Sequence, residues 1–430
     1  MKIINFGGAT AIIEHNGKRI LFDPWLDDGI FHGAWFHFPP TVLGIEDIGH
    51  VDYVYISHIH EDHCSAGTIK HINSDAEIIL MDRKPNLVNN FLKNNGFNFK
   101  KIHFISPRCP VELEPGLIVD IVEADPDDEM SHLIDSALML NWDGFVLYNA
   151  NDCQPYDNGI KYINENYKKV DLALLPYSGG SGYPSCYTNL TDKEKLLEKE
   201  RIVNGRIVSF IDVVRKINPV MVLPFADAWC VGGSRSYLNK FVAHSSCRGV
   251  VEKPFVDAKL DANLLLLNTG QEYNFDTDEK YPDEPYTYQT DKIRDDYINT
   301  NLKDVLYDYE RFSFEPTVSV IRLFKYARTR QWEVQKKLNY FPKFNFYFDA
   351  TDSNQRFRIN SEIEDFEEIS IGSDLIEPYL RISVSRNLLI MLLIGHISWN
   401  IADAAFFLDY DRAPNKYDPE LYALLNYLRS

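Results

Sequence analysis

A strand-like segment that ends in a histidine-rich motif constrains this sequence more than any other feature. Residues 51–57, VDYVYIS, are β-branched and aromatic, a composition typical of a buried strand. HIHEDH follows at 58–63 and places three histidines and one aspartate within six residues. Neutral imidazoles bind zinc, iron and related divalent metals, and a carboxylate adds charge and a harder donor. The sequence therefore predicts a metal site where this strand leaves its sheet, with a solvated loop as the alternative.

The spacing of the motif divides its ligands into two pairs. His58 and His60 can chelate one metal from a tight loop, whereas Asp62 and His63 fall on the next turn and can serve a second. Two metals need further ligands, and we expect them from His132, just before a predicted strand, and Asp152, just after one. The two oxygens of an aspartate can bridge two metals. The alternatives are a surface or core histidine at 132 and a turn residue at 152.

Short strands alternate with helices along the first part of the chain. Residues 3–25 predict a hairpin and a following strand, with Asn16-Gly17 as a turn in which both residues tolerate positive φ. Residues 64–72 predict a helix, 188–217 a long helix or a helix pair, and 219–225 a strand. Because strands dominate and the motifs fall at their ends, we predict a layered α/β sandwich.

The composition changes between residues 268 and 297, a segment that is acidic, aromatic and short of aliphatic side chains. We place the domain boundary there, which gives a metal-binding domain at 1–275 and an accessory α+β domain at 280–430. In the second domain, residues 300–340 predict helices, 343–350 and 355–363 strands, and 385–399 a core helix. This domain would serve dimerisation or substrate capping, or would be a structural extension that buries one face of the first.

The charge and the cysteines narrow the functional classes. A net charge of −19 argues against binding to nucleic acid or anionic membrane, although an anionic small molecule remains open because a metal supplies local positive charge. The six cysteines form no CxxC pair, which argues against disulfides and zinc knuckles and favours a cytoplasmic location. We see no signal peptide, and the longest apolar run, 388–394, is too short to span a membrane.

These motifs resemble a known family. HIHEDH, a distant histidine and a later aspartate are similar to the metallo-β-lactamase superfamily. Within it, the match is to the metal-binding domain of the CMP-N-acetylneuraminic acid hydroxylases. It rests on FDPWL (22–26), FHGAWFHFPP (31–40), NANDC (149–153), YSGGSGYP (177–184), VLPFADAW (222–229) and, more weakly, residues 395–412. The resemblance implies a metallo-β-lactamase-type αββα sandwich, one or two metals, and a sugar- or nucleotide-related substrate. The CxH…CxxH pattern of a Rieske cluster does not occur in these residues.

The resemblance also implies a last histidine ligand after a late strand, but residues 224–234 contain none. We expect Asp227 or His244 to substitute, or the second metal position to be weak or empty. Asp23 would orient a ligating histidine, with a turn residue as the alternative. Substrate contacts are expected from His37, with an aromatic lid as the alternative, and from Ser178, Gly179 and Gly180, whose backbone N–H groups suit an anion or a sugar, with a plain loop as the alternative.

Three functions remain. The first is a metal-dependent hydrolase acting on an anionic sugar- or nucleotide-related molecule through a metal-bound hydroxide, with Asp62 orienting the water or carrying its proton. Zinc is the first expectation for the metal, with iron or manganese as alternatives. The second function is a non-haem diiron oxygenase, or its catalytic component, served by an electron-transfer partner. The third is a binding module whose metal site has decayed. A homodimer is an open alternative for each.

Overall fold

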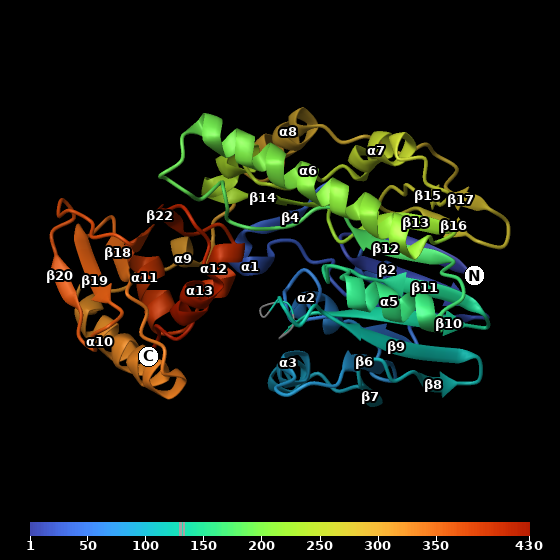
Figure 1. The fold of residues 1–430 in the computed structure, drawn as a ribbon, viewed down its shortest axis with the longest axis horizontal. Helices are drawn as coiled ribbons and strands as arrows, with labels where there is room; N and C mark the ends of the chain where they lie inside the picture. The colour runs from blue at the N-terminus through green and yellow to red at the C-terminus, as the bar shows by residue number, and fades with distance from the viewer. Residues whose placement is uncertain (129–130, 132–133) are drawn as a thin grey trace.

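The structure, a computed structural model, describes residues 1–128, 131 and 134–430. Its first domain contains two face-to-face sheets with helices on both outer faces (Figure 1), which confirms the predicted αββα sandwich. The first sheet has the order β17 (Glu279–Tyr281), β16 (Glu272–Asn274), β1 (Lys2–Gly7), β2 (Thr10–His15), β3 (Lys18–Phe22), β5 (Tyr53–Tyr55), β6 (Glu77–Met81), β7 (Lys101–Ile105). The second has the order β15 (Asn263–Leu264), β13 (Met221–Phe225), β12 (Leu172–Pro176), β11 (Phe145–Asn149), β10 (Ser136–Trp142), β9 (Leu117–Glu123), β8 (Val111–Glu114).

Apolar side chains from the inner faces of both sheets form the central core, including Phe22, Tyr55, Leu138 and Leu172. Two helices, α2 (Ala66–Ile69) and α3 (Leu87–Asn94), cover the outer face of the first sheet. Three more, α5 (Asp157–Asn166), α6 (Asp192–Ile217) and α7 (Glu252–Asp257), cover the second. Strands β3, β5, β6 and β7 are parallel, as are β11, β12, β13 and β15, so each sheet has a rim formed by carboxyl ends of strands.

Local signals explain several of these elements. Asn16 and Gly17 have φ values of 50° and 77° and form the predicted turn between β2 and β3. Residues 192–217 form one helix, not a pair. A reciprocal capping box between Thr191 and Glu194 starts α6, and Asn218 ends it in the left-handed conformation.

The second domain has a five-stranded sheet covered by helices. Its strand order is β20 (Glu367–Ile369), β19 (Gln355–Asn360), β18 (Asn345–Ala350), β21 (Tyr379–Val384), β22 (Asp409–Ala413). Its helices are α9 (Asp308–Arg311), α10 (Val320–Leu338), α11 (Arg386–Leu393), α12 (Trp399–Ala404) and α13 (Pro419–Leu425). Every residue from Leu388 to Leu393 is buried, as predicted for a core helix.

The predicted boundary at 275–280 falls inside a hairpin of the first sheet. Strand β16 pairs with β1, and β17 pairs with β16, so the first domain continues past residue 281. The helix α8 (Asp291–Asn301) then packs through Ile298 onto Phe36 and Phe38 of the first domain. Edge strands and a surface helix bury only one face, which explains why this segment contains few aliphatic residues.

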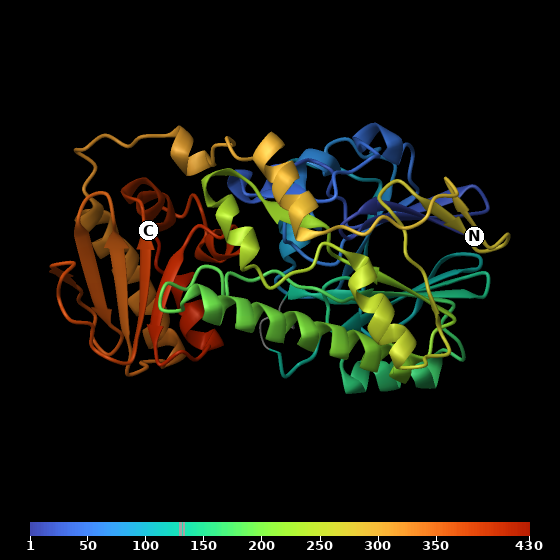
Figure 2. The same ribbon diagram turned by 90° about the horizontal axis from the view of Figure 1, so that it is seen from above.

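The two domains lie side by side (Figure 2), and one cluster of buried apolar side chains includes residues of both. Strand β4 (Trp35–His37), which follows α1 (Ile30–Gly33), forms a small sheet with β14 (Trp229–Val231). In this sheet the ring centroids of Trp35 and Trp229 stack 3.7 Å apart. The Trp35 indole donates a hydrogen bond to the Ala404 carbonyl (2.9 Å), and Tyr410 N donates one to the Cys186 carbonyl (2.8 Å). Helix α12 and strand β22 are thereby held against the first domain, as expected for an extension that buries one of its faces.

Three short 3₁₀ helices complete the structure, at Ile45–Ile48, Gly233–Lys240 and Arg248–Val251. All six cysteines are free, as predicted. Within the described ranges, no helix combines the length and the apolar character that crossing a bilayer demands.

Candidate metal centre

His58 and His60, the first two histidines of the HIHEDH motif, face each other. Strand β5 ends at Tyr55, and the chain turns out of the sheet at Ser57 and His58, both buried. His58 Nε2 lies 2.9 Å from His60 Nδ1, while His58 Nδ1 lies 3.0 Å from the Ser57 hydroxyl. One nitrogen from each ring is therefore directed at a common point, as the spacing of the motif predicts.

A second group of donors forms around His63. Its Nε2 lies 3.5 Å from Asp62 Oδ2 and 3.4 Å from Asp152 Oδ2. Asp152 follows β11 at the rim of the second sheet, and its side chain is 42% exposed. Ligand atoms of His58, His63 and Asp152 all lie within 4.8 Å of one another, so the two groups form one cluster. The structure thus brings five of the predicted ligands together, and His132 lies outside the described residues.

Asp23 holds this cluster from behind. It follows β3, is fully buried, and accepts hydrogen bonds from Ser57 N (2.7 Å) and the Ser57 hydroxyl (2.9 Å). Its other contact is with His63 Nδ1 at 3.0 Å. A carboxylate that accepts from one ring nitrogen fixes the tautomer and directs the other nitrogen outward. Asp23 therefore fixes the orientation of His63, which the sequence predicts as a ligand.

Burial and neighbouring charges shift the pKa values of the side chains in the cluster. Burial, followed by the neighbouring His63, lowers the pKa of both His58 and His60, which keeps these imidazoles neutral at neutral pH. Burial alone would lower the pKa of His63, but the carboxylates of Asp152, Asp62 and Asp23 outweigh it and raise that pKa. Burial raises the pKa of Asp62 to about 7.

A buried acid that sequence reasoning missed adjoins the cluster. Asp135 Oδ1 lies 4.0 Å from His58 Nδ1, and the Asp135 side chain is buried. Burial, and then the charge of Asp152, raises the pKa of Asp135 to about 7. Asp135 immediately precedes β10, whose pairing with β11 places it across from the Asp152 loop. The sequence places both His132 and Asp135 just before a predicted strand, and the prediction selected the histidine.

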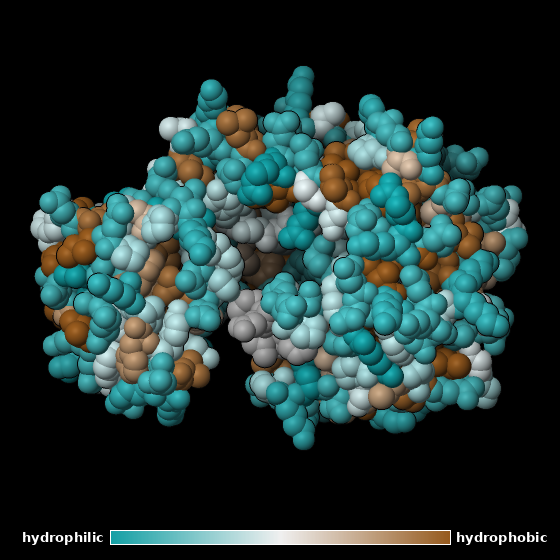
Figure 3. Space-filling model, viewed as in Figure 1, coloured by the Kyte–Doolittle hydropathy of each residue, from teal (hydrophilic) through white to brown (hydrophobic). Residues whose placement is uncertain are grey.

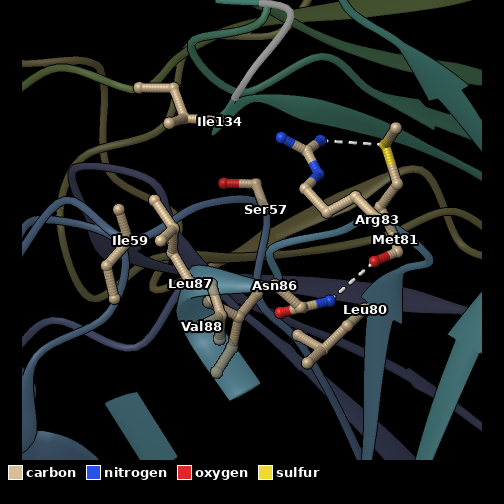
Figure 4. Close-up of a pocket in the computed structure, with 10 residues that line it drawn as sticks. Ser57, Ile59, Leu80, Met81, Arg83, Asn86, Leu87, Val88 and Ile134 are labelled. Carbon is tan, nitrogen blue, oxygen red and sulfur yellow. Dashed lines mark hydrogen bonds between the residues drawn. The ribbon is translucent and has the colours of Figure 1, made fainter. Parts of the chain in front are cut away.

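A small cavity of about 20 Å³ lies beside Ser57 (Figure 4). Aliphatic side chains line it together with the arginine Arg83, whose Nη2 donates to the carbonyl of Asp135 and to Met81 Sδ. The positive charge of Arg83 also contributes to the lowered pKa of His58. This cavity is too small for an organic substrate, so Arg83 supports the cluster from within the protein.

Two further side chains approach the open side of the cluster. Arg206 of α6 stands beside the glycine-rich loop, since a Cβ on Gly179 would lie 3.6 Å from Arg206 Nε, and its charge lowers the pKa of Asp152. Asn400 of α12 also interacts with His60 and opposes the lowering of the His60 pKa by burial and by His63. Neither contact has a local sequence signal, because both residues reach the cluster only through the tertiary fold.

The two substitutes expected for a last histidine have partners other than the cluster residues. The carboxylate of Asp227 accepts from Arg248 Nε at 3.0 Å and from the Tyr177 hydroxyl. His244 Nδ1 lies 2.8 Å from the Ser178 hydroxyl, and its ring stacks on Trp229. The Asp227 carboxylate and His244 Nδ1 thus have partners within the protein, whereas His244 Nε2 has none among the described residues, so a ligand role for either residue stays a prediction.

The residues expected to contact substrate are also packed inward. His37 is fully buried, stacked on Trp25 at 3.8 Å and bonded to Asp28. Ser178 is buried, and its hydroxyl accepts from Ser245 N. A Cβ on Gly180 would come within 2.9 Å of the Trp35 ring, so packing explains the lack of a side chain there. Of the four, only Gly179 has an environment that suits an anion, because Arg206 is adjacent.

The donor set fits divalent metals. Three imidazoles and two carboxylates converge. Ser57 and Asp23 contact the Nδ1 atoms of His58 and His63, which leaves the Nε2 atoms of these two rings facing the other donors of the cluster. Such nitrogen and oxygen ligands suit zinc, iron and manganese. His58 and His60 would hold one ion, Asp62 and His63 a second, and Asp152 lies where it could reach both.

Comparison with known proteins places this geometry in a family. The model of the β-lactamase superfamily domain matches residues 2–226. A Rieske 2Fe-2S iron–sulfur protein of Mycolicibacterium smegmatis is 29% identical over 44% of this chain and 36% of its own length. The cytidine monophosphate-N-acetylneuraminic acid hydroxylase of Danio rerio is 24% identical over 61% of this chain and 46% of its own length.

The chain thus spans less than half the length of these relatives. Among solved structures, Igni18, a metallo hydrolase from Ignicoccus hospitalis, has 18% identity and a TM-score of 0.43, with 64% of this chain and 98% of that chain covered. With a family model that covers more than half of the sequence and a converging ligand set, this chain belongs to the β-lactamase superfamily and has the metallo-β-lactamase fold of a metal-dependent enzyme.

Proposed function

We propose that this chain is a metal-dependent hydrolase of an anionic sugar- or nucleotide-related small molecule. The observation that carries the proposal is the convergence of His58, His63 and Asp152 within 4.8 Å at the rim where the strands end. The cluster combines buried ligands with one half-exposed carboxylate. Donors that are fixed on one side and open on the other suit a catalytic metal position better than a structural one, which would be closed.

Each residue of the cluster has a separate task. Divalent metal ions bound there would polarise the substrate and lower the pKa of water. Asp23 and Ser57 keep His63 and His58 in the orientations that expose one nitrogen each. We assign Asp62 Oδ2, 3.5 Å from His63 Nε2, as the atom that orients the attacking water or carries its proton.

Local positive charge supports an anionic substrate despite the net charge of −19. Arg206 has no ion pair among the described residues and lies near Gly179, and after His63 and His60 its charge also contributes to the lowered pKa of Asp152. A guanidinium at this place can bind a carboxylate or phosphate group that approaches the cluster. The nucleotide-sugar relationship of the Danio rerio relative is consistent with such a substrate.

The test is hydrolysis of a panel of esters, lactones and phosphodiesters by protein reconstituted with zinc, manganese or iron. The expected result is turnover of at least one class, which His60→Ala abolishes because it removes a ligand without touching the central core. Turnover that is equal in wild type and His60→Ala, or absent for every member of the panel and every metal, would overturn the proposal.

The second candidate is a non-haem diiron oxygenase or its catalytic component. The observation that favours it is the sequence match to a hydroxylase and to a Rieske iron–sulfur protein. The same donor set suits iron, and an electron-transfer partner would then be required. Metal analysis of freshly purified protein separates the two functions: two irons per chain would favour the oxygenase, whereas zinc alone would exclude it.

A further inference from the structure

A cavity of about 730 Å³ lies between the two domains. Tyr183 and Tyr187 from the glycine-rich segment line one side, and Arg412 of β22 and Tyr422 of α13 line the other. Figure 3 shows the molecular surface hollowed between the C-terminal domain and the rest of the protein. Asn400 of α12 also lines this cavity.

Arg412 is the unusual group in this cavity. It is only 8% exposed, yet it forms no ion pair with any described carboxylate. Its guanidinium lies over the Tyr187 ring at 4.6 Å and the Tyr183 ring at 5.2 Å. Nε donates to Asn415 Oδ1 (2.9 Å), and Nη1 makes long contacts with the hydroxyls of Tyr422 (3.3 Å) and Tyr187 (3.5 Å).

Other buried arginines show how unusual this is. Arg248 is paired with Asp227 at 3.0 Å. Arg328, which also lacks a carboxylate, uses all three of its nitrogens on backbone carbonyls and on the amide oxygens of Gln331 and Gln335. The Nη2 nitrogen of Arg412 has no hydrogen-bond partner in the described part of the chain. A buried cation without compensation is costly, and a bound anion would remove that cost.

The remaining charges of the cavity leave this guanidinium available. Arg201 is bound to Glu198 at 2.7 Å, and Asp403 accepts a hydrogen bond from the Tyr410 hydroxyl at 2.9 Å. Lys416 also lines the cavity and has no ion pair among the described residues. The tyrosine rings stack on the guanidinium face and leave Nη2 free, and Nη2 together with the weakly held Nη1 offers N–H donors that match an oxyanion.

We propose that this cavity is an oxyanion-binding pocket in which Arg412 binds the carboxylate or phosphate group of a small organic anion. The hydroxyls of Tyr187 and Tyr422 lie beside it, 2.5 Å apart, and while one donates to the other the second can donate to the oxyanion. Both domains supply part of the pocket, which gives the C-terminal domain a role in binding. Use of the pocket to anchor a substrate rests on the proposed function, whereas oxyanion binding itself does not.

The experiment is calorimetric titration of the full chain, stripped of metal with a chelator that is then removed, with inorganic phosphate and separately with succinate. Metal removal prevents anion binding at the cluster, and the two ligands distinguish phosphate from carboxylate recognition. We expect saturable binding of at least one anion, weakened about tenfold or more in Arg412→Lys, which keeps the charge but loses the planar pair of donors. Arg201→Gln, in the same cavity but paired with Glu198, should change affinity by less than about twofold.

A second measurement uses only the wild-type protein, so it does not depend on how the variants fold. It asks whether a bound anion protects Arg412 from an arginine-modifying reagent. Phenylglyoxal should modify Arg412 in the free protein, and the bound anion should slow that modification several-fold without protecting Arg201, as peptide mass spectrometry would show. Equal affinity in wild type and Arg412→Lys, no binding of either anion at millimolar concentration, or unchanged modification of Arg412 would each overturn the proposal. None of these results depends on hydrolysis, so failure of the proposed function would be seen separately.

Discussion

Asp152 and Asp227 occupy equivalent places in the second sheet but have opposite environments. Each follows a central strand, β11 and β13 respectively, at the same rim of the sandwich. The Asp152 side chain is 42% exposed and faces His63 Nε2. The Asp227 side chain is fully buried and faces Arg248 Nε at 3.0 Å. One acid is open to a ligand, and the other is sealed by a cation of the protein itself.

The comparison shows that a position at a strand end does not by itself make an aspartate a ligand. Parallel strands bring their carboxyl ends to one rim, which explains why both residues are candidates from the sequence. The partner that the tertiary fold supplies then decides the role. Asp152 receives a histidine of the motif, whereas Asp227 receives an arginine from twenty-one residues further along the chain. We therefore expect Asp152 to control metal binding and Asp227 to control stability.

The largest effect is expected at the open acid. Asp152→Asn should lower the kcat/KM of the metal-loaded protein at least about 10³-fold, equivalent to about 4 kcal/mol of transition-state stabilisation, because it removes the negative charge and one carboxylate oxygen from the proposed ligand set. The free energy of unfolding of the metal-free protein should change by less than about 1 kcal/mol. Steady-state kinetics and urea titration measure the two quantities. A variant that keeps its activity but unfolds easily would reverse the comparison.

At Asp227 the expected effects are reversed, with a loss of stability and little change in metal binding. Arg248→Met leaves the Asp227 carboxylate buried without a cation, which should lower the free energy of unfolding by about 3–5 kcal/mol. Zinc binding by the folded fraction should stay within about twofold of wild type. The double variant Arg248→Met with Asp227→Leu is the matched control, and it should recover much of the lost stability because no unpaired charge remains. Loss of metal without loss of stability would contradict this assignment.

A smaller effect is expected at Asp23, which is sealed like Asp227 but serves the cluster. Asp23→Asn keeps an oxygen for Ser57 N and loses the charge opposite His63 Nδ1, so zinc affinity should fall about 10- to 100-fold. The nearby Asp27 is a suitable control because it accepts from Ser65 and Thr68 and touches no ligand. Competition with a metal-binding dye measures both variants. Equal losses of zinc affinity in Asp23→Asn and Asp27→Asn would contradict the role of Asp23 in positioning His63.

The smallest effect concerns a buried acid of the second domain. Burial raises the pKa of Asp403 to about 6, so between pH 4 and 6 the folded chain holds a proton that the unfolded chain releases. This group's contribution to stability is therefore fully present below pH 4 and falls as pH rises through 6. Asp403→Asn should remove that part of the pH dependence, about 1 kcal/mol after allowance for its partial exposure. Urea titrations at pH 5 and 7.5 test this, and an unchanged difference between the two pH values would contradict it.

The sequence predicts the parts of the site that depend on local order. His58, His60, Asp62 and His63 are contiguous, and the strand before them is a strong hydrophobic run, so both their identity and their rim position can be predicted. The hairpin at Asn16-Gly17 and the α11 core helix follow for the same reason. Each depends on residues close together in the chain, where turn chemistry and periodicity act directly.

Contacts between distant segments could not be predicted. Asn400 approaches His60 across more than three hundred residues, and Arg248 seals Asp227 only after the chain returns to the sheet edge. The domain boundary was misplaced for a related reason: edge strands such as β16 and β17 need few aliphatic residues, so their composition resembles that of a linker. Asp135 was missed because one strand start offers both a histidine and an aspartate.

Metal content per chain tests the central claim most directly. Wild type, Asp152→Asn and Asp227→Asn would each be stripped, dialysed against zinc under folding conditions and analysed by inductively coupled plasma mass spectrometry. We expect one or two equivalents in wild type, the same number in Asp227→Asn, and a loss of at least one equivalent in Asp152→Asn. A wild-type protein that binds no zinc, manganese or iron, or equal losses in the two variants, would contradict it.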